Sequence, residues 1–261
     1  MERSRWLALT VLCAAMMMII LDGTIVTVAL PTIQRDLGFS ASGLAWVVNA
    51  YLIAFGGLLL LAGRLGDLIG GKRVFLSGLV VFTAASLLCG FAVSQPMLIA
   101  ARFAQGAGGA MASAVSLGMI VRLFPDPPGR ARALGAYSFT GAGGASLGLV
   151  LGGVLTQALS WHWIFFVNAP IGAVAIAAGW RLLAGEQGTS LRGGADAAGA
   201  VLVTGGLMAA VYVIVQTGRY GWGSARTLGA AAVALALLAA FALRQHLART
   251  PLLPLRIFRT R

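Results

Sequence analysis

Eight long apolar segments, separated by short polar connections, make up most of the chain. Each is about 20 residues long or longer, which is the length that an α-helix needs to cross the hydrocarbon core of a bilayer. Turn-forming residues support the breaks, because Pro31 closes the first segment and residues 125–129 stop the fourth. The pattern predicts membrane-spanning helices over residues 6–30, 44–65, 74–93, 97–121, 133–157, 162–183, 197–217 and 226–244.

The composition excludes an ordinary soluble domain. Of the 261 residues, 59% are hydrophobic and only 10% are charged, whereas about a quarter of the residues in a soluble domain are charged. The first apolar segment is too long for a secretory signal, so we expect an uncleaved span. Cys13 and Cys89 both lie in apolar segments, which favours packed thiols over a disulfide framework.

The basic residues are distributed unevenly between the two sides of the predicted membrane. The 19 Lys and Arg residues outnumber the 7 Asp and Glu residues, and the formal net charge is +12. All but four of the basic residues fall on one side; the exceptions are Arg35, Arg219 and Arg226 on the other side and Arg102 within a span. The positive-inside rule therefore predicts that both termini are cytoplasmic. Because topology explains the basic charge, we expect no nucleic-acid partner.

Two ionisable residues, Asp22 and Arg102, lie well inside apolar segments. A charge at the centre of a bilayer costs about 2.5–3.5 kcal/mol on insertion scales, so such residues usually face a cavity or a partner. From the helical rise, Asp22 lies roughly 12 Å and Arg102 roughly 7–8 Å from the same face of the membrane. A long arginine side chain can bridge that difference if the two helices are neighbours. Both a structural ion pair and a role in proton or substrate binding remain open.

Glycine is about twice as frequent as in average proteins, with 36 residues in the chain. In the fifth segment Gly144, Gly148 and Gly152 recur at every fourth position, and Gly153 follows directly. This spacing predicts a smooth stripe against which another helix can pack closely. Plain helix packing and a sliding or gating surface both fit the pattern.

The segment Gly66–Lys72 has the spacing of a phosphate-binding loop, but we do not expect it to bind a nucleotide. The segment satisfies the spacing G-x-x-x-x-G-K, yet Arg73 stands where a serine or threonine would bind Mg²⁺, and no strand precedes it. His162 and His246 have neither metal-ligand spacing nor partners for a catalytic triad. We therefore expect no metal site and no enzyme activity.

Several segments together resemble the major facilitator superfamily, and within it the branch of fourteen-span drug/proton antiporters. The resemblance covers essentially the whole chain. It is carried by Gly63–Arg73, Leu21–Pro31, Arg102–Gly108, Gly144–Gly153, Ser160–Gly172, Gly221–Trp222, Phe241 and Pro251–Phe258.

The resemblance implies an all-α integral membrane fold, with the N-terminal six-helix bundle of the superfamily followed by two further transmembrane helices. On this basis residues 1–184 form the six-span transporter half and 185–196 a cytoplasmic linker. Residues 197–245 form the two additional spans, and 246–261 form a basic cytoplasmic tail. The family has a second half, which is missing after Arg261, and substrate normally binds between the halves.

The resemblance also implies roles for individual residues. Asp22 would bind and release a proton, and Arg102 and Gln105 would belong to the same proton-coupling site and substrate cavity. A cytoplasmic latch would stabilise the outward-facing state, and an antiporter glycine stripe would let the two halves slide. The latch residues are Gly63, Arg64, Asp67, Gly70, Lys72 and Arg73, and the stripe residues are Gly144, Gly148, Gly152 and Gly153.

Three positions depart from the family pattern. Leu149 stands where the fifth-span motif usually has proline, which removes the expected kink. Gly71 replaces a basic latch residue, and His162 replaces an arginine.

The function implied is proton-coupled export of small lipophilic, often cationic compounds across the cytoplasmic (inner) membrane. The expected partners are the lipid bilayer, protons, the substrate and a second transporter half. We expect no cofactor, because the proton gradient supplies the energy. Two alternatives stay open. The chain could be a half-transporter that assembles as an oligomer through an exposed glycine stripe, or a non-transporting scaffold or inert shortened product.

Overall fold

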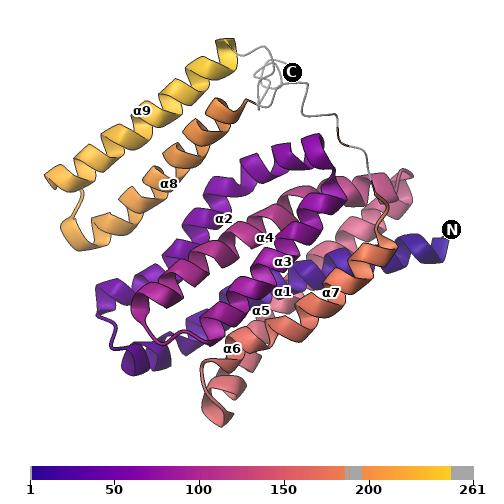
Figure 1. Cartoon of the computed structure of the whole chain (residues 1–261), viewed down its shortest axis with the longest axis horizontal. Helices are drawn as coiled ribbons and strands as arrows, with labels where there is room; N and C mark the ends of the chain where they lie inside the picture. Colours follow the sequence, from indigo (N-terminus) through magenta and orange to yellow (C-terminus); the bar gives the residue numbers. More distant parts are fainter. Residues whose placement is uncertain (1, 186–187, 189–195, 248–261) are drawn as a thin grey trace.

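The computed structural model describes residues 2–185, 188 and 196–247, and within these residues all the regular secondary structure is α-helical (Figure 1). Within the described ranges eight stretches are long and apolar enough to cross a membrane, and the sixth, Trp163–Leu182, combines two consecutive helices. The helices of the described chain are α1 (Glu2–Leu37), α2 (Ala41–Ile69), α3 (Gly71–Gly90), α4 (Gln95–Leu123), α5 (Pro127–Ala158), α6 (Trp163–Phe166), α7 (Asn168–Leu182), α8 (Ala197–Tyr220) and α9 (Ala225–Leu247).

The predicted spans are all present, but the prediction that the first helix ends at Pro31 is wrong. Helix α1 continues through Pro31 to Leu37. Ala29 and Ile33, on either side of the proline, are both fully buried, so packing on both turns compensates for the hydrogen bond that proline cannot donate. Most of the predicted linker (186–187 and 189–195) and of the predicted tail (248–261), with the Pro251–Phe258 motif, lies outside the described residues.

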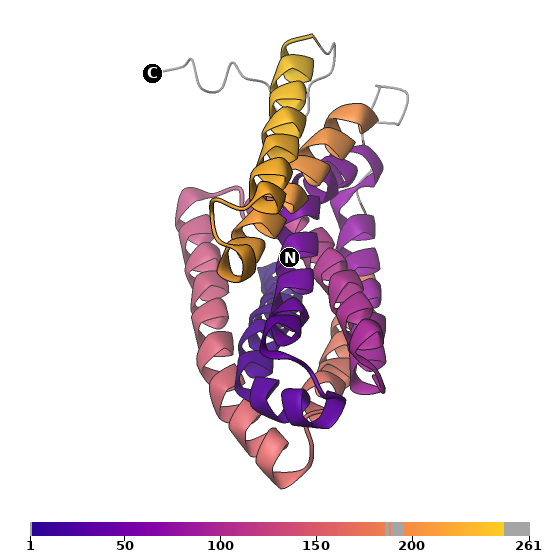
Figure 2. The same ribbon diagram turned by 90° about the vertical axis from the view of Figure 1, so that its left-hand side faces the viewer.

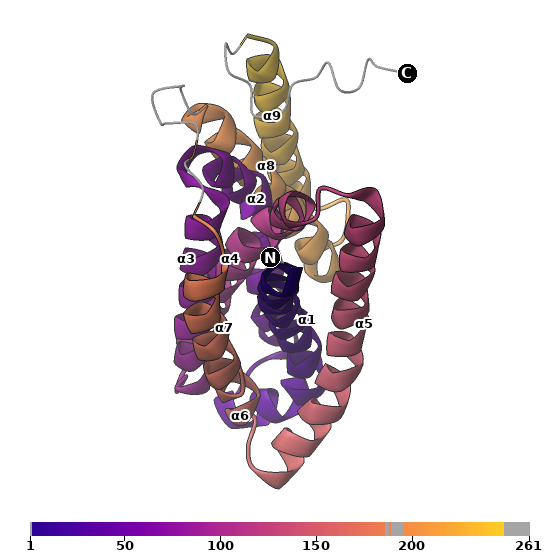
Figure 3. The ribbon, with the colours of Figure 1, turned by 90° about the vertical axis from the view of Figure 1, so that its right-hand side faces the viewer.

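The helices are arranged around α1. Seen from the two ends, α5 lies on one side of α1, and α3 and α7 lie on the other (Figures 2 and 3). Helices α2 and α4 pack beside each other, and the α8–α9 hairpin lies along α2. In the described part of the chain α8 packs closely against α2 and α9 does not, so the hairpin is bound to the six-span bundle mainly through α8.

Two apolar clusters form the core of the six-span bundle. One contains Leu12, Phe75 and Ile120, and the other contains Ile25 and Phe165. The buried polar residues that lie near the boundary between the two clusters in the sequence of their helices are Asp22, Thr83, Ser86, Arg102 and Gln105. Ser116, by contrast, lies within the first cluster. The core therefore has a polar layer between two apolar ones.

Glycines allow α4 to touch both of its neighbours. A Cβ atom on Gly106 would overlap the backbone carbonyl of Tyr51 in α2, and one on Gly108 would overlap the backbone of Phe82 in α3. These contacts bring the three backbones closer than any other residue type would permit.

The glycine stripe of α5 faces α1. Gly144, Gly148 and Gly152 are all buried, and a Cβ atom on Gly148 would lie 2.9 Å from the carbonyl oxygen of Leu21. The half-transporter alternative, in which an exposed glycine stripe binds a partner chain, does not fit these three glycines, because α1 already covers them. Gly153 is not part of the stripe, since a Cβ atom there would meet nothing within 4 Å.

Asp196 joins the two ends of the α8–α9 hairpin. Its carboxylate accepts the backbone N–H of Gly199, which caps α8, and also accepts N–H groups of Arg244 and Gln245 from the last turns of α9. Burial acts to raise the pKa of Asp196, but the hydrogen bonds from Arg244, Gly199 and Gln245 outweigh it and hold the pKa below its usual value.

The packing of the glycine stripe predicts that alanine substitutions at Gly148 and Gly153 affect the melting temperature differently. Gly148→Ala should lower the melting temperature of the purified protein, because the added methyl group meets the backbone of Leu21 and overpacking costs about 1–3 kcal/mol. Gly153→Ala should leave it unchanged or raise it, because alanine is the better helix former and the position is open. Equal effects of the two substitutions would contradict the α1–α5 contact.

Asp196 generates a prediction about pH. Since its pKa is lowered in the folded state, its stabilising contribution is complete above about pH 3.9, the usual value, and is lost as the pH falls through the folded pKa. We expect Asp196→Asn to lower the melting temperature at pH 7, and the difference from wild type to shrink toward pH 3. Asp126→Asn is the control, because Asp126 caps α5 through Gly129 and its substitution should cost less at pH 7. A difference for Asp196→Asn that stays constant with pH would contradict the assignment.

Candidate functional site

The two charges predicted to lie inside the membrane meet in the polar layer of the bundle. Arg102 Nη1 lies 2.6 Å from Asp22 Oδ2, and the side chains are 1% and 0% exposed. Helices α1 and α4 are therefore close enough for the arginine to reach across, as the estimate of their depths required. The pair is shielded from solvent and lipid on all sides.

Gln105, one turn after Arg102 on α4, closes a triangle with the ion pair. Its side-chain oxygen accepts from Arg102 Nη1 at 2.7 Å, and its Nε2 donates to Asp22 Oδ1 at 2.8 Å. The Cys89 thiol of α3 donates to the same glutamine oxygen at 3.6 Å. The three residues expected to form one site are thus brought together.

Helix α2 supplies further contacts to the arginine. Arg102 Nε donates to the backbone carbonyl of Val47 at 3.0 Å, and the guanidinium carbon lies 4.3 Å from the centre of the Tyr51 ring. A cation over an aromatic face is stabilised by the ring quadrupole. These contacts hold the guanidinium in place independently of Asp22.

Two polar residues that the sequence interpretation missed complete the site. Asn168, at the start of α7, donates from Nδ2 to Asp22 Oδ1 at 2.9 Å and to Ser86 Oγ at 3.0 Å. Ser86 of α3 in turn donates to the carbonyl of Phe165 at 2.9 Å. The signal available was a polar residue within each of two apolar segments. We call Asp22, Arg102, Gln105, Asn168 and Ser86 the Asp22 cluster.

The predicted latch residues lie away from the Asp22 cluster, at the connection between α2 and α3. Arg64 and Asp67 form an ion pair at 3.8 Å across one helical turn, and Lys72 Nζ donates to the carbonyl of Trp180 in α7 at 2.8 Å. Gly63 is half-buried and Arg73 is exposed.

The same connection shows why this segment is unlike a phosphate-binding loop. Gly66–Ile69 form the last turn of α2, and α3 begins at Gly71. Only Gly70 is not helical, and its φ of 98° requires glycine. No stretch of extended loop is left to surround a phosphate.

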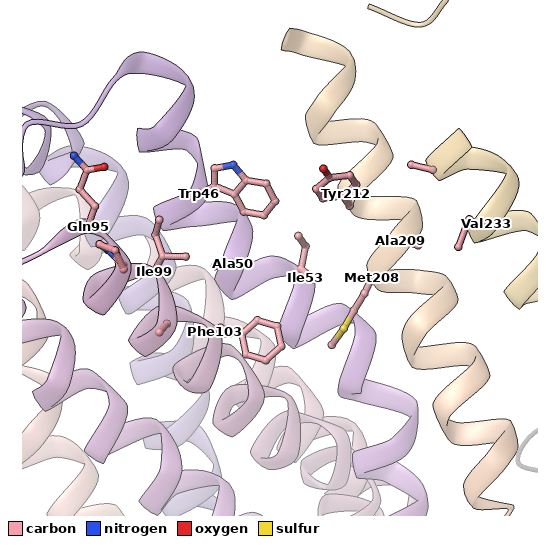
Figure 4. Close-up of a pocket in the computed structure, with 13 residues that line it drawn as sticks. Trp46, Ala50, Ile53, Gln95, Ile99, Phe103, Met208, Ala209, Tyr212 and Val233 are labelled. Carbon is pink, nitrogen blue, oxygen red and sulfur yellow. The ribbon is translucent and has the colours of Figure 1, made fainter. Parts of the chain in front are cut away.

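Several cavities open between the described helices, and two of them lie beside α2 and α4. One, of about 650 Å³, lies among α1, α2, α4 and α5; apolar side chains such as Ile20, Phe55 and Leu117 line it, and Arg64 and Asp67 border it. The other, of about 1020 Å³, lies among α2, α4, α8 and α9; Trp46 and Tyr212 both line it, and their ring centroids are 5.9 Å apart (Figure 4). Among the described residues no charged side chain lines the second cavity, and neither cavity is lined by Asp22, Arg102 or Gln105.

The buried pair generates a prediction about stability. Arg102→Met should destabilise the protein by about 3–5 kcal/mol, because it leaves the Asp22 carboxylate buried without its cation. Asp22→Asn combined with Arg102→Met should recover much of this loss, because no net charge is then buried. The measurement is the thermal midpoint of each purified variant. A double variant no more stable than Arg102→Met would show that the charges do not interact.

Solved structures share this arrangement of helices. A bacterial homologue of the human lysosomal transporter Spinster, in an inward-facing and unoccupied conformation, gives a TM-score of 0.61 over 94% of this chain and 62% of its own, at 17% identity. The human organic anion transporter MFSD10 gives 0.63 over 78% of this chain and 54% of its own, at 14% identity. At these identities the likeness concerns the fold alone.

Curated relatives are more similar in sequence. The puromycin resistance protein of Streptomyces alboniger is 42% identical over 96% of this chain and 49% of its own length. The cephamycin export protein of Amycolatopsis lactamdurans is 43% identical over 96% of this chain and 52% of its own length. The chain thus spans about half the length of these relatives. The sequence profile of the Major Facilitator Superfamily matches residues 12–259, and the chain, a multi-pass membrane protein, belongs to that superfamily.

Proposed function

We propose that the chain is the N-terminal portion of a proton-coupled exporter of small lipophilic compounds, in which Asp22 carries the proton. Two kinds of observation support the proposal. Similar proteins include one named for puromycin resistance and one named for cephamycin export. The observation that carries the mechanism is a fully buried carboxylate with donors from Arg102, Gln105 and Asn168.

The Asp22 cluster can convert proton binding into a change of conformation. The negative charge of ionised Asp22 balances the positive charge of Arg102, and three N–H donors stabilise the carboxylate. Protonation removes the negative charge while Arg102 stays buried, held by Val47 and Tyr51. An unpaired buried cation is costly, so the protonated protein favours another arrangement of the helices. Proton binding thereby shifts a two-state equilibrium.

The substrate class follows from the smaller cavity. Its walls are mostly apolar, and the ion pair of Arg64 with Asp67 lies at its border. Such a surface favours lipophilic compounds, and a cationic one would compete with Arg64 for the carboxylate of Asp67. In the exporter this cavity faces a second transporter half, and residues 1–184 serve as the first half.

The α2–α3 connection serves as the latch on the cytoplasmic side. Arg64 with Asp67, and Lys72 with the end of α7, provide contacts that can differ between two conformations. The concentration of Lys and Arg on this side of the spans supports an orientation with both termini in the cytoplasm and a location in the cytoplasmic membrane.

Removal of the Asp22 charge tests the proposal. Asp22→Asn in the full-length protein should abolish proton-driven efflux of ethidium, a lipophilic cation, because an amide cannot release a proton. Efflux should fall to that of cells without the protein, at equal abundance in the membrane. Asp36→Asn is the matched control, since it makes the same change on the exposed end of α1 and leaves an acceptor for Trp161. Unchanged efflux by Asp22→Asn would refute the proton role.

A further inference from the structure

The sixth membrane span has a break in its helical hydrogen bonding next to the Asp22 cluster. Helix α6 ends at Phe166 and α7 starts at Asn168, but the path of the chain stays helical, because Val167 between them has φ −59° and ψ −25°. Pro170 explains the break, because it has no N–H to donate to the carbonyl of Phe166, and its ring crowds that carbonyl. The Ser86 hydroxyl donates to the neighbouring carbonyl of Phe165 at 2.9 Å. The break therefore lies beside a contact with α3, the helix that also contacts Asn168.

Asn168 links this break to the carboxylate of Asp22. Its side chain is fully buried, and both hydrogens of Nδ2 have acceptors, in Asp22 and Ser86. Its Oδ1, by contrast, has no hydrogen-bond partner among the described residues. A buried amide oxygen without a partner is costly and calls for a physical explanation.

The two protonation states of Asp22 need different partners. An ionised carboxylate can only accept hydrogen bonds, so Nδ2 of Asn168 must face it. The Oδ1 atom of Asn168 then has no donor. A protonated carboxyl also donates one O–H. The oxygen of Gln105 already accepts from Arg102 and Cys89. Half a turn of the Asn168 amide would exchange Nδ2 for Oδ1 and provide the missing acceptor.

The surroundings of Asp22 contain few other groups that could respond to protonation. The charged or titratable groups that face it or its partners are Arg102 from α4, Cys89 from α3 and Tyr51 from α2. On the side of α5, the stripe residues Gly144 and Gly148 approach α1. Of the donors to Asp22 in the described chain, Asn168 alone comes from the sixth span.

We propose that Asn168 is a positioning residue that donates to Asp22 when the carboxylate is ionised and, with its amide reversed, accepts from Asp22 when it is protonated. The sixth span then senses the charge of Asp22 at its own break point. This inference rests on the proposed role of Asp22 as the proton carrier.

Infrared spectroscopy of the full-length protein in lipid nanodiscs tests the inference without a substrate. The carbonyl band of protonated Asp22, identified by its loss in Asp22→Asn, is followed as the pH falls. In Asn168→Leu the midpoint pH of this band should rise by about one unit, because a hydrogen bond to a charged acceptor is stronger than one to a neutral group. Ser116→Ala is the control, since Ser116 is buried in the same bundle but lies outside the Asp22 cluster, where its hydroxyl donates to the carbonyl of Ala112, and its midpoint should stay near that of wild type.

A second band reports the amide itself. The side-chain carbonyl band of Asn168, identified by its loss in Asn168→Leu, should shift in the same titration step as Asp22, because Oδ1 gains a hydrogen bond. A purely structural role would leave this band unmoved. If Asn168→Leu does not fold, Asn168→Ala removes the same amide with a smaller side chain and gives the same test.

The outcomes separate the two proposals. A titrating Asp22 band with an unchanged midpoint in the Asn168 variants, or an Asn168 band that does not respond, would overturn the role of Asn168 and leave the proton role intact. If no band that Asp22→Asn removes titrates with pH, the proton role fails, and the role of Asn168 fails with it.

Discussion

The structure depends on the burial of one ion pair, Asp22 with Arg102. Each ion loses several kcal/mol of hydration when it is buried, and a single partner rarely compensates. Here the carboxylate has three N–H donors, and the guanidinium has a carboxylate, an amide oxygen, a backbone carbonyl and an aromatic ring. These partners come from α1, α2, α4 and α7. The charges can be buried only if all four helices hold their relative positions to within a hydrogen-bond length.

Glycine makes such close positions possible. Gly106 directly follows Gln105 and lies against the backbone of Tyr51, the residue whose ring covers Arg102. Gly148 lies against the carbonyl of Leu21, the residue before Asp22. Two close helix contacts therefore flank the ion pair in the sequence of α4 and of α1. A larger residue at either glycine would push apart helices that the hydrogen bonds of the Asp22 cluster require to be close.

Hydropathy was sufficient to predict the spans and the two intramembrane charges, because charged and apolar residues differ strongly in their cost of insertion. It could not predict which helices are neighbours, since that depends on side-chain packing between distant segments. Asn168 was missed because an uncharged amide in an apolar segment gives a weak signal, and its importance depends on a residue far away in sequence. The same limit explains Gly153, which directly follows Gly152 in sequence but has no neighbouring helix within 4 Å of a Cβ atom. At Pro31, tertiary packing overrode a local helix-breaking signal.

The position of the Asp22 cluster also constrains how export could be coupled to protons. If a substrate displaced the proton directly, both would have to reach the same carboxylate. In the described residues, however, Asp22 lines neither cavity, and its carboxylate is enclosed by α1, α4 and α7. Helix α1 nevertheless connects Asp22 to its surroundings. Ile20, two residues before Asp22, lines the smaller cavity, and Ile25, three residues after it, lies in the apolar core. Under the proposed function, coupling therefore acts through movement of the helices that carry these residues, and the break before Asn168 is a point where such movement can begin.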